Sequence, residues 1–190
     1  MTSYKDITDE ILYSRFLKEH DEGLLRELLE RHGRSLTLFL NGMVQSMEDA
    51  EELMIDSFAV IASETVSYTP RRDCSFKTWL FAIAQNKARM LLRKRRLVFT
   101  ELDEEICSET SLPEPELFEK EERRQLYEAL EEINPDYRQV LFLTYFEDMK
   151  PEEIARVLKK SSKQVYNLTA RGKEALKKAL ERNGFNYAKY

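Results

Sequence analysis

Apolar residues recur at spacings of three and four along most of this chain, which is the repeat of an amphipathic helix. In the first half the repeat predicts four helices, over about 11–17, 24–40, 48–66 and 75–96. Pro70 and its polar neighbours interrupt the repeat and predict a loop before the last of these helices. Four helices with short connections are typical of a compact bundle.

The second half continues the helical pattern in shorter units. A helix is expected from about 116 to 133, and in the next one Asn134 caps the N-terminus and Pro135 takes the first helical position. The stretches KPEEIARVL and SSKQVYNLTARGKEALKKAL then predict two helices separated by a very short polar turn, with Ser161 or Ser162 capping the second. This order of elements is that of a helix-turn-helix.

The segment between the two halves has a different composition. It is acidic, contains two prolines and follows no helical period. With five glycines in 190 residues, the chain also has few of the turn residues that an all-β fold needs. We therefore predict an all-α protein with two small helical domains, an N-terminal helix bundle (1–97) and a C-terminal helix-turn-helix domain (116–184), joined by an acidic linker (98–115).

Charge is distributed unevenly along the chain. The net charge is −5, yet residues 71–96 carry nine Lys or Arg and one Asp, and residues 150–178 carry nine Lys or Arg and three Glu. The stretches 1–64 and 101–132 are acidic in turn. Such alternation indicates a partner with localised negative charge, for example the phosphates of a nucleic acid.

The last predicted helix has one polar face. Val165, Leu168 and Gly172 lie on the buried side when the helix is projected at about 100° per residue. On the opposite side, amides and cations would reach base edges near the helix start and phosphates further along. The candidate residues for reading duplex DNA are Ser162, Lys163, Gln164, Asn167, Arg171 and Lys173. The alternative is a solvated face on an ordinary terminal helix.

A second polar stripe runs along the predicted helix 75–96. Its members are Gln85, Asn86, Arg89, Arg93 and Arg96. A solvated face usually mixes charges of both signs, whereas this stripe contains no carboxylate, so an anionic partner is favoured. Three alternatives to a nucleic-acid partner stay open. The cations could form a cluster like a nuclear-localisation signal, they could be favoured at a helix end by its dipole, or they could pair with the acidic linker.

The loop before this helix adds a second kind of contact. Tyr68, Arg71 and Arg72 combine an aromatic ring with cations, the combination that holds unpaired bases. We therefore add them to the candidate nucleic-acid site, with a plain connecting loop as the alternative. Trp79, the only tryptophan, lies on the apolar side of the helix and is expected in the core.

The predicted helix 48–66 presents an acidic surface with apolar residues among its carboxylates. Glu51, Glu52 and Asp56 lie beside Ile55. Carboxylates alone would suggest a solvated face, but exposed apolar residues among them indicate a protein partner.

Several classes of function are disfavoured by the residues present. Cys74 and Cys107 are far apart and are expected to be free thiols, and His20 and His32 complete no zinc spacing. No glycine-rich phosphate loop, nucleophile motif or His beside paired carboxylates is present, so we expect no metal, no cofactor and no enzymatic activity. No apolar run reaches the roughly 18 residues of a membrane span. No secretory signal is visible either, so we expect a cytoplasmic protein without membrane insertion.

Three stretches carry a resemblance to a known family. The chain resembles the extracytoplasmic-function group of sigma-70 factors, the promoter-recognition subunits of bacterial RNA polymerase, in DAEELMIDSF (49–58), SFKTWLFAIAQNKARMLLRKRR (75–96) and the stretch 134–176. The order matches that of sigma region 2, linker and region 4. Family members often carry Gly in the helix-turn-helix turn, where this chain has Lys159.

The resemblance implies roles for the candidate residues. Glu51, Glu52, Ile55 and Asp56 would meet the clamp helices of the polymerase β′ subunit, and region 4 would meet the β flap. The stripe from Gln85 to Arg96 and the loop with Tyr68 would hold the minus 10 element, and residues 162–173 would read the minus 35 element. Core RNA polymerase, promoter DNA and an anti-sigma factor are the implied partners.

Two rival functions remain at this point. A one-component helix-turn-helix regulator would bind duplex DNA alone, usually as a dimer. A helical adaptor would use the two acidic blocks to bind basic proteins and would show no dependence on DNA.

Overall fold

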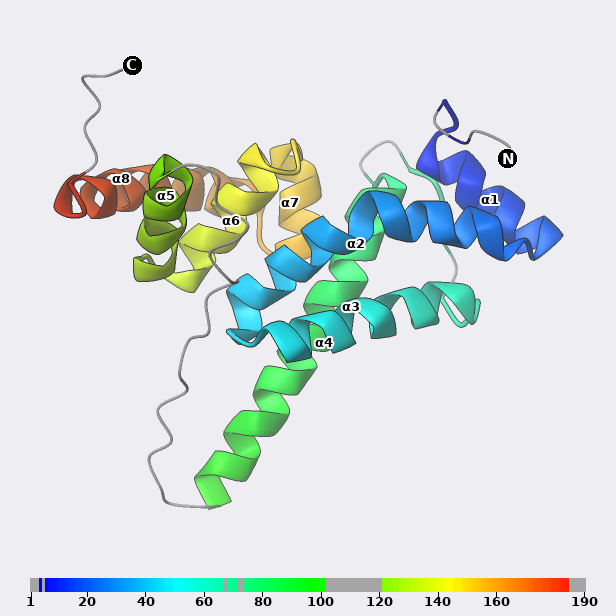
Figure 1. Cartoon of the computed structure of the whole chain (residues 1–190), viewed down its shortest axis with the longest axis horizontal. Coiled ribbons are helices and arrows are strands. Elements are labelled where there is room, and N and C mark those ends of the chain that lie inside the picture. The colour runs from blue at the N-terminus through cyan, green and yellow to red at the C-terminus, as the bar shows by residue number, and fades with distance from the viewer. Residues whose placement is uncertain (1–3, 5, 67, 72–73, 102–120, 185–190) are drawn as a thin grey trace.

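The computed structural model describes residue 4 and residues 6–66, 68–71, 74–101 and 121–184, and every regular element in these ranges is a helix. The described residues form eight helices, so the all-α prediction is confirmed. Figure 1 shows how these helices are arranged. Their bounds are α1 Asp9–Glu19, α2 Glu22–Val44, α3 Met47–Ala62, α4 Phe76–Glu101, α5 Glu121–Glu132, α6 Pro135–Tyr145, α7 Pro151–Leu158 and α8 Ser162–Arg182.

The N-terminal helices start where capping residues occur. The Asp21 side chain accepts a hydrogen bond from the Gly23 backbone N–H at 2.8 Å to start α2, and Ser46 caps α3 through the backbone N–H of Asp49. Such caps satisfy backbone donors that have no partner within the helix. The periodicity extended the third helix too far, since α3 ends at Ala62. It stopped the fourth too early, because α4 continues past 96 to Glu101.

The C-terminal helices form the expected helix-turn-helix. Asn134 caps α6, and Ser161 rather than Ser162 caps α8 through the backbone N–H of Gln164 at 3.2 Å. Lys159 ends α7 in the left-handed conformation with φ at 53°, where glycine is the favoured residue. The turn therefore places a residue that has a Cβ atom in a strained conformation.

The two halves pack against each other. α7 lies on α4, and α6 lies on α2, so buried apolar residues from both halves join one cluster. In Figure 1 the far end of α4 projects away from this body. The domain limits 1–97, 98–115 and 116–184 stay a prediction. The helix runs through 98–101, and most of the linker, with Cys107, lies outside the described residues.

Candidate nucleic-acid interface

The polar face of α8 stands free of the core. Val165 and Gly172 are buried against the rest of the domain, while Lys163, Asn167 and Arg171 are exposed on the other side. An added Cβ at Gly172 would lie 3.3 Å from Leu141 of α6, so glycine allows the two helices to approach this closely. The first turns of α8 are thereby held rigidly with their polar side outward, as a reading helix requires.

Two candidate residues on α8, Gln164 and Lys173, have local partners. The Gln164 side-chain oxygen accepts the Ser161 backbone N–H at 2.8 Å and its hydroxyl at 3.1 Å, which completes a capping box. Ser162 is half-buried, and the Lys173 ammonium lies 5.1 Å from the centre of the Tyr145 ring. Gln164 therefore stabilises the helix start in this structure, a use that projection of a single helix does not reveal.

One exposed residue on this face was missed by the sequence analysis. Tyr166 is 59% exposed and lies on the second turn of α8, next to Asn167. Its position between the candidates Gln164 and Asn167 could have indicated a contact with a base, because apolar groups in a major groove contact the methyl group of thymine.

The stripe on α4 divides into an outer part and a covered part. Arg93 and Arg96 are exposed toward the projecting end, and Asn86 is half-buried. Gln85 is only 1% exposed, and Arg89 donates a hydrogen bond to the Leu158 carbonyl oxygen at 3.0 Å. The C-terminal half of the protein therefore buries Gln85, whereas Arg89 bonds to it and stays exposed.

Other cations of the 71–96 segment bind carboxylates of α3. Arg95 Nη2 lies 2.6 and 2.7 Å from the two carboxylate oxygens of Asp49, and this contact lowers the pKa of Asp49. Lys87 pairs with Asp56 at 3.0 Å. These cations therefore hold α4 on α3, and the positive charge available to a ligand is smaller than the residue count suggests.

The loop candidates lie beside an aromatic cluster. The Tyr68 ring packs against Trp79, 5.2 Å between ring centres, and against Tyr13 and Phe76. Its hydroxyl donates to the Cys74 carbonyl oxygen, and burial raises the pKa of Tyr68 to about 12. Trp79 is partly buried and packs against the core cluster, as expected of a residue on the apolar side of the helix. Tyr68 shares that packing, Arg71 is exposed, and Arg72 lies outside the described residues.

The acidic candidates share one exposed surface of α3. Glu51, Glu52 and Asp56 are exposed there, and Ile55 between them is 62% exposed. A large apolar side chain ringed by carboxylates suits a protein partner with an apolar centre and a basic rim.

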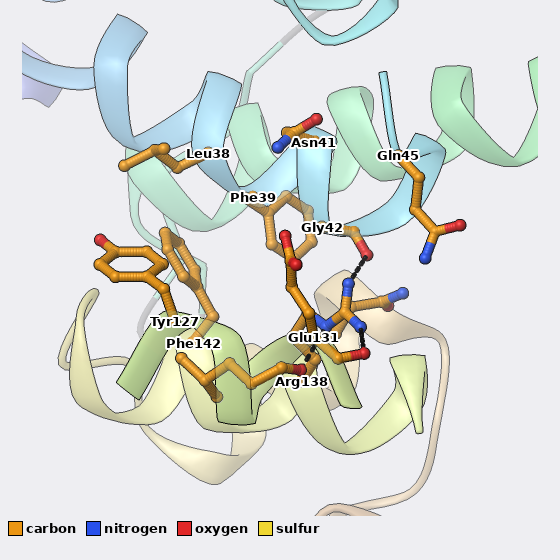
Figure 2. A pocket seen from close by; sticks show the side chains of 11 residues that line it. Leu38, Phe39, Asn41, Gly42, Gln45, Tyr127, Glu131, Arg138 and Phe142 are labelled. Carbon is orange, nitrogen blue, oxygen red and sulfur yellow. Dashed lines mark hydrogen bonds between the residues drawn. The ribbon is translucent and has the colours of Figure 1, made fainter. Parts of the chain in front are cut away.

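A cavity lies between α2 and the helices α5 and α6. Figure 2 shows apolar walls that include Phe39 and Phe142, with Arg138 at one side. The Arg138 guanidinium donates to the carbonyl oxygens of Leu130 at 2.7 Å and Gly42 at 3.4 Å, so it joins the two halves. Burial lowers the pKa of Arg138.

The described residues form neither a cluster of metal ligands nor a membrane-spanning helix. No three His, Cys, Asp or Glu side chains come together there as metal ligands would. Among the helices described, none is both long enough and apolar enough to cross a bilayer.

Known proteins match this chain along most of its length. The sigma-70 region 2 family matches residues 28–98, and the sigma-70 region 4 family matches residues 123–176. The RNA polymerase sigma factor CarQ of Myxococcus xanthus is 32% identical over 81% of this chain and 87% of its own length. The chain belongs to the sigma-70 family. The ECF RNA polymerase sigma factor SigX of Bacillus subtilis, 25% identical over 81% of this chain and 82% of its own length, assigns it to the extracytoplasmic-function group.

Solved structures agree with this assignment. CnrH, solved with the cytosolic domain of CnrY, has a TM-score of 0.63 at 25% identity, covering 92% of this chain and 97% of that one. RpoE of Bartonella quintana, solved with the anti-sigma factor NepR, has a TM-score of 0.70 at 18% identity, covering 82% of this chain and 96% of that one; it shows the fold alone.

The assignment settles the general activity. This sigma factor is a promoter-specificity subunit that binds core RNA polymerase and directs transcription initiation. A sigma factor of this kind is a DNA-binding initiation factor. The one-component regulator and the helical adaptor are therefore set aside.

Proposed function

We propose that this sigma factor divides promoter recognition between two faces. The outer part of α4, with Asn86, Arg93 and Arg96, holds the minus 10 element, and the loop with Tyr68, Arg71 and Arg72 captures an unpaired base from it. Arg89, which is exposed, belongs to the same face, and buried Gln85 joins it once the C-terminal half moves away. The polar face of α8, with Lys163, Asn167, Arg171 and Lys173, reads the minus 35 element, while Ser162 and Gln164 shape its start.

The placement of exposed charge carries this proposal. In a chain with a net charge of −5, exposed cations occur on the outer end of α4 and on the free face of α8. Two weak binding faces on one chain gain effective concentration when both sites lie on the same DNA. Core polymerase brings the acidic protein to the promoter, so only these two faces need to be basic.

We further propose partners for the remaining surfaces. The acidic surface of α3, with Glu51, Glu52, Ile55 and Asp56, binds the β′ clamp helices, and region 4 binds the β flap. An anti-sigma factor holds the free protein, as the solved structures of CnrH with CnrY and RpoE with NepR suggest by analogy. The protein acts in the cytoplasm and catalyses no reaction of its own.

In vitro transcription with core polymerase over a genomic fragment library tests the two faces. Arg93→Glu and Lys163→Glu are each expected to abolish promoter use while core binding is retained, because both residues are assigned to DNA. Lys177→Glu is a matched control, since Lys177 is exposed at the far end of the same α8. Loss of core binding in either test variant, or normal start sites in both, would contradict the assignment of the faces.

A further inference from the structure

One side of α6 packs against α8 and ends in an exposed aromatic residue. Tyr137, Leu141 and Tyr145 follow one another at intervals of four residues, so they share one side of α6. An added Cβ at Gly172 of α8 would lie 3.3 Å from both Tyr137 and Leu141, and glycine at this position allows the close approach. The next residue of α8, Lys173, has its ammonium 5.1 Å from the centre of the Tyr145 ring.

The contact between Lys173 and Tyr145 is a cation–π contact at the surface. Its distance lies within the roughly 6 Å at which a ring face attracts an ammonium group. Tyr145 is 53% exposed and Lys173 is exposed as well, so the pair is open to another molecule. An ammonium group has three N–H donors, and the ring takes up only one side of it. The remaining donors can bind an oxygen atom of a partner.

The lysines further along α8 are held by groups of a different kind. Lys177 lies 3.9 Å from the Glu181 carboxylate, and Lys178 lies 2.9 Å from the Glu174 carboxylate. A carboxylate cancels the charge of the lysine that it holds, whereas an aromatic ring has no net charge. Tyr145 therefore holds Lys173 in place and leaves its positive charge available to an anion.

Lys173 lies at one edge of the polar face of α8. It follows the exposed Tyr166 by seven residues, two turns of the helix, and both lie beside the central residues Lys163 and Asn167 in projection. From Lys163 to Lys173 the helix rises about 15 Å at 1.5 Å per residue. The major groove is about 12 Å wide. If the first turns of α8 read bases, Lys173 therefore lies beyond them, at the level of the sugar-phosphate backbone.

We propose that Tyr145 is a positioning residue of the minus 35 site, whose ring holds the Lys173 ammonium at the edge of the α8 face, where it binds a DNA phosphate. The inference rests on the proposed function, because it needs this face to bind duplex DNA. A lysine side chain loses rotamer freedom when it binds a phosphate. The ring orders the ammonium beforehand, so less freedom is lost on binding. α6 thereby contributes to the DNA interface although it carries none of the base-reading residues.

Duplex binding by the holoenzyme tests the role of the ring. Core polymerase is combined with each full-length variant, and the DNA is the fragment that gives the strongest new start site in the library transcription. Affinity is measured by fluorescence anisotropy over a series of salt concentrations. Lys173→Gln removes the charge, Tyr145→Leu removes the ring, and Tyr145→Phe keeps the ring without its hydroxyl. The double variant combines Tyr145→Leu with Lys173→Gln, and Lys177→Gln is the matched control on the same helix.

The expected result links the ring to the ammonium. Lys173→Gln should lower the magnitude of the slope of log affinity against log salt by about 0.9, the value of one phosphate contact. Tyr145→Leu should weaken binding about two- to fivefold at low salt, the range of an exposed cation–π contact. In the Lys173→Gln background the same change should have no further effect, because the ring acts through the ammonium. Tyr145→Phe and Lys177→Gln should bind as the wild type does.

Several results would overturn the positioning role. Tyr145→Leu could bind with wild-type affinity, or weaken binding equally with and without Lys173, as a purely structural residue would. A loss in Tyr145→Phe would assign the effect to the hydroxyl, and a loss of core binding in Tyr145→Leu would assign the ring to polymerase. If Tyr145→Leu loses its helical circular dichroism, Tyr145→Met replaces it with the same expected changes. Unfolding of both would make the ring part of the folding core and would also overturn the proposal.

The same measurements separate failure of the inference from failure of the proposed function. If only the positioning role is wrong, Lys173→Gln lowers the salt slope and Tyr145→Leu leaves affinity unchanged. If Lys163→Glu abolishes binding but Lys173→Gln leaves the slope unchanged, Lys173 binds no phosphate, and the inference falls while the reading face stands. If the face itself is wrongly assigned, neither Lys163→Glu nor Lys173→Gln changes affinity. A library without a new start site would refute the proposed function, and the inference with it.

Discussion

The pair between Asp49 and Arg95 joins the start of α3 to the outer part of α4. Arg95 Nη2 contacts both carboxylate oxygens at 2.6 and 2.7 Å, with Asp49 18% and Arg95 40% exposed. Asp49 also lies in the first turn of α3, where its backbone N–H donates to the Ser46 hydroxyl. We expect this pair to stabilise the protein and to keep Arg95 out of the DNA face.

The partial burial of the Asp49–Arg95 pair sets the expected size of its coupling free energy. Hydrogen bonds to charged groups contribute about 1.5–3 kcal/mol in mutational series, whereas fully exposed ion pairs contribute about 0–1 kcal/mol. A pair with one partner mostly buried and the other half-exposed should give a coupling free energy of about 1 kcal/mol. Asp49→Asn alone should cost roughly 1.5 kcal/mol, because the favourable interaction with the α3 dipole is lost as well.

A double-mutant cycle isolates the pair. Urea unfolding of the full-length wild type, Asp49→Asn, Arg95→Gln and the double variant yields the coupling free energy at neutral pH. Since Arg95 lowers the pKa of Asp49 in the folded state, the contribution is fully present above the unfolded pKa of about 4. It is lost as the pH falls through the folded pKa.

Two results would refute this reasoning. A coupling free energy below about 0.3 kcal/mol at neutral pH, the usual error of additivity, would mean that the ion pair contributes nothing. A coupling that persists undiminished under strongly acidic conditions would show that it does not arise from the charged carboxylate. Arg95→Gln should also leave promoter use intact, in contrast to Arg93→Glu, and this checks that Arg95 has a structural role.

Three further predictions concern stability. Gly172→Val should destabilise the packing of α8 on α6 by about 1–3 kcal/mol in urea unfolding, because the added side chain enters a contact already at 3.3 Å. Ser161→Ala should cost about 1 kcal/mol and lower the midpoint of thermal unfolding, because the α8 cap is lost. Although burial raises the pKa of Asp9, His32 and Arg31 lower it overall, so the stabilisation is present above about pH 4 and lost in acid. Asp9→Asn should therefore be less stable at neutral pH and show a flatter loss of stability on acidification.

The helices and their caps could be predicted because both depend on nearby residues. The apolar spacing located each described helix, and Asn134 and Ser161 start α6 and α8 as capping residues do. The end of α4 was misplaced because the helix continues beyond the last clear apolar repeat, through Glu101. Local periodicity thus identified the elements better than it set their ends.

The sequence predicted the candidate site only where a single helix decides which side chains are exposed. Projection placed Arg93 outward on α4, in agreement with its exposure, but it also placed Gln85 and Arg89 in the same stripe. The burial of Gln85 depends on α6, and the hydrogen bond of Arg89 depends on α7; both helices follow 50 or more residues later in the chain. Such contacts depend on tertiary packing, and no pattern within α4 encodes them.

The described cations of the basic segment 71–96 form two groups: some bind acceptors of the protein itself, and others are exposed. Lys77, Lys87, Arg89 and Arg95 bind acceptors on the protein itself, and so fasten α4 to α3 and to the C-terminal half. The cations of this segment that are exposed and have no such role here, among them Arg93, are therefore fewer than the nine that the sequence contains. The internal ion pairs thus hold a strongly basic helix within an acidic protein and leave its remaining exposed cations for the proposed contact with DNA.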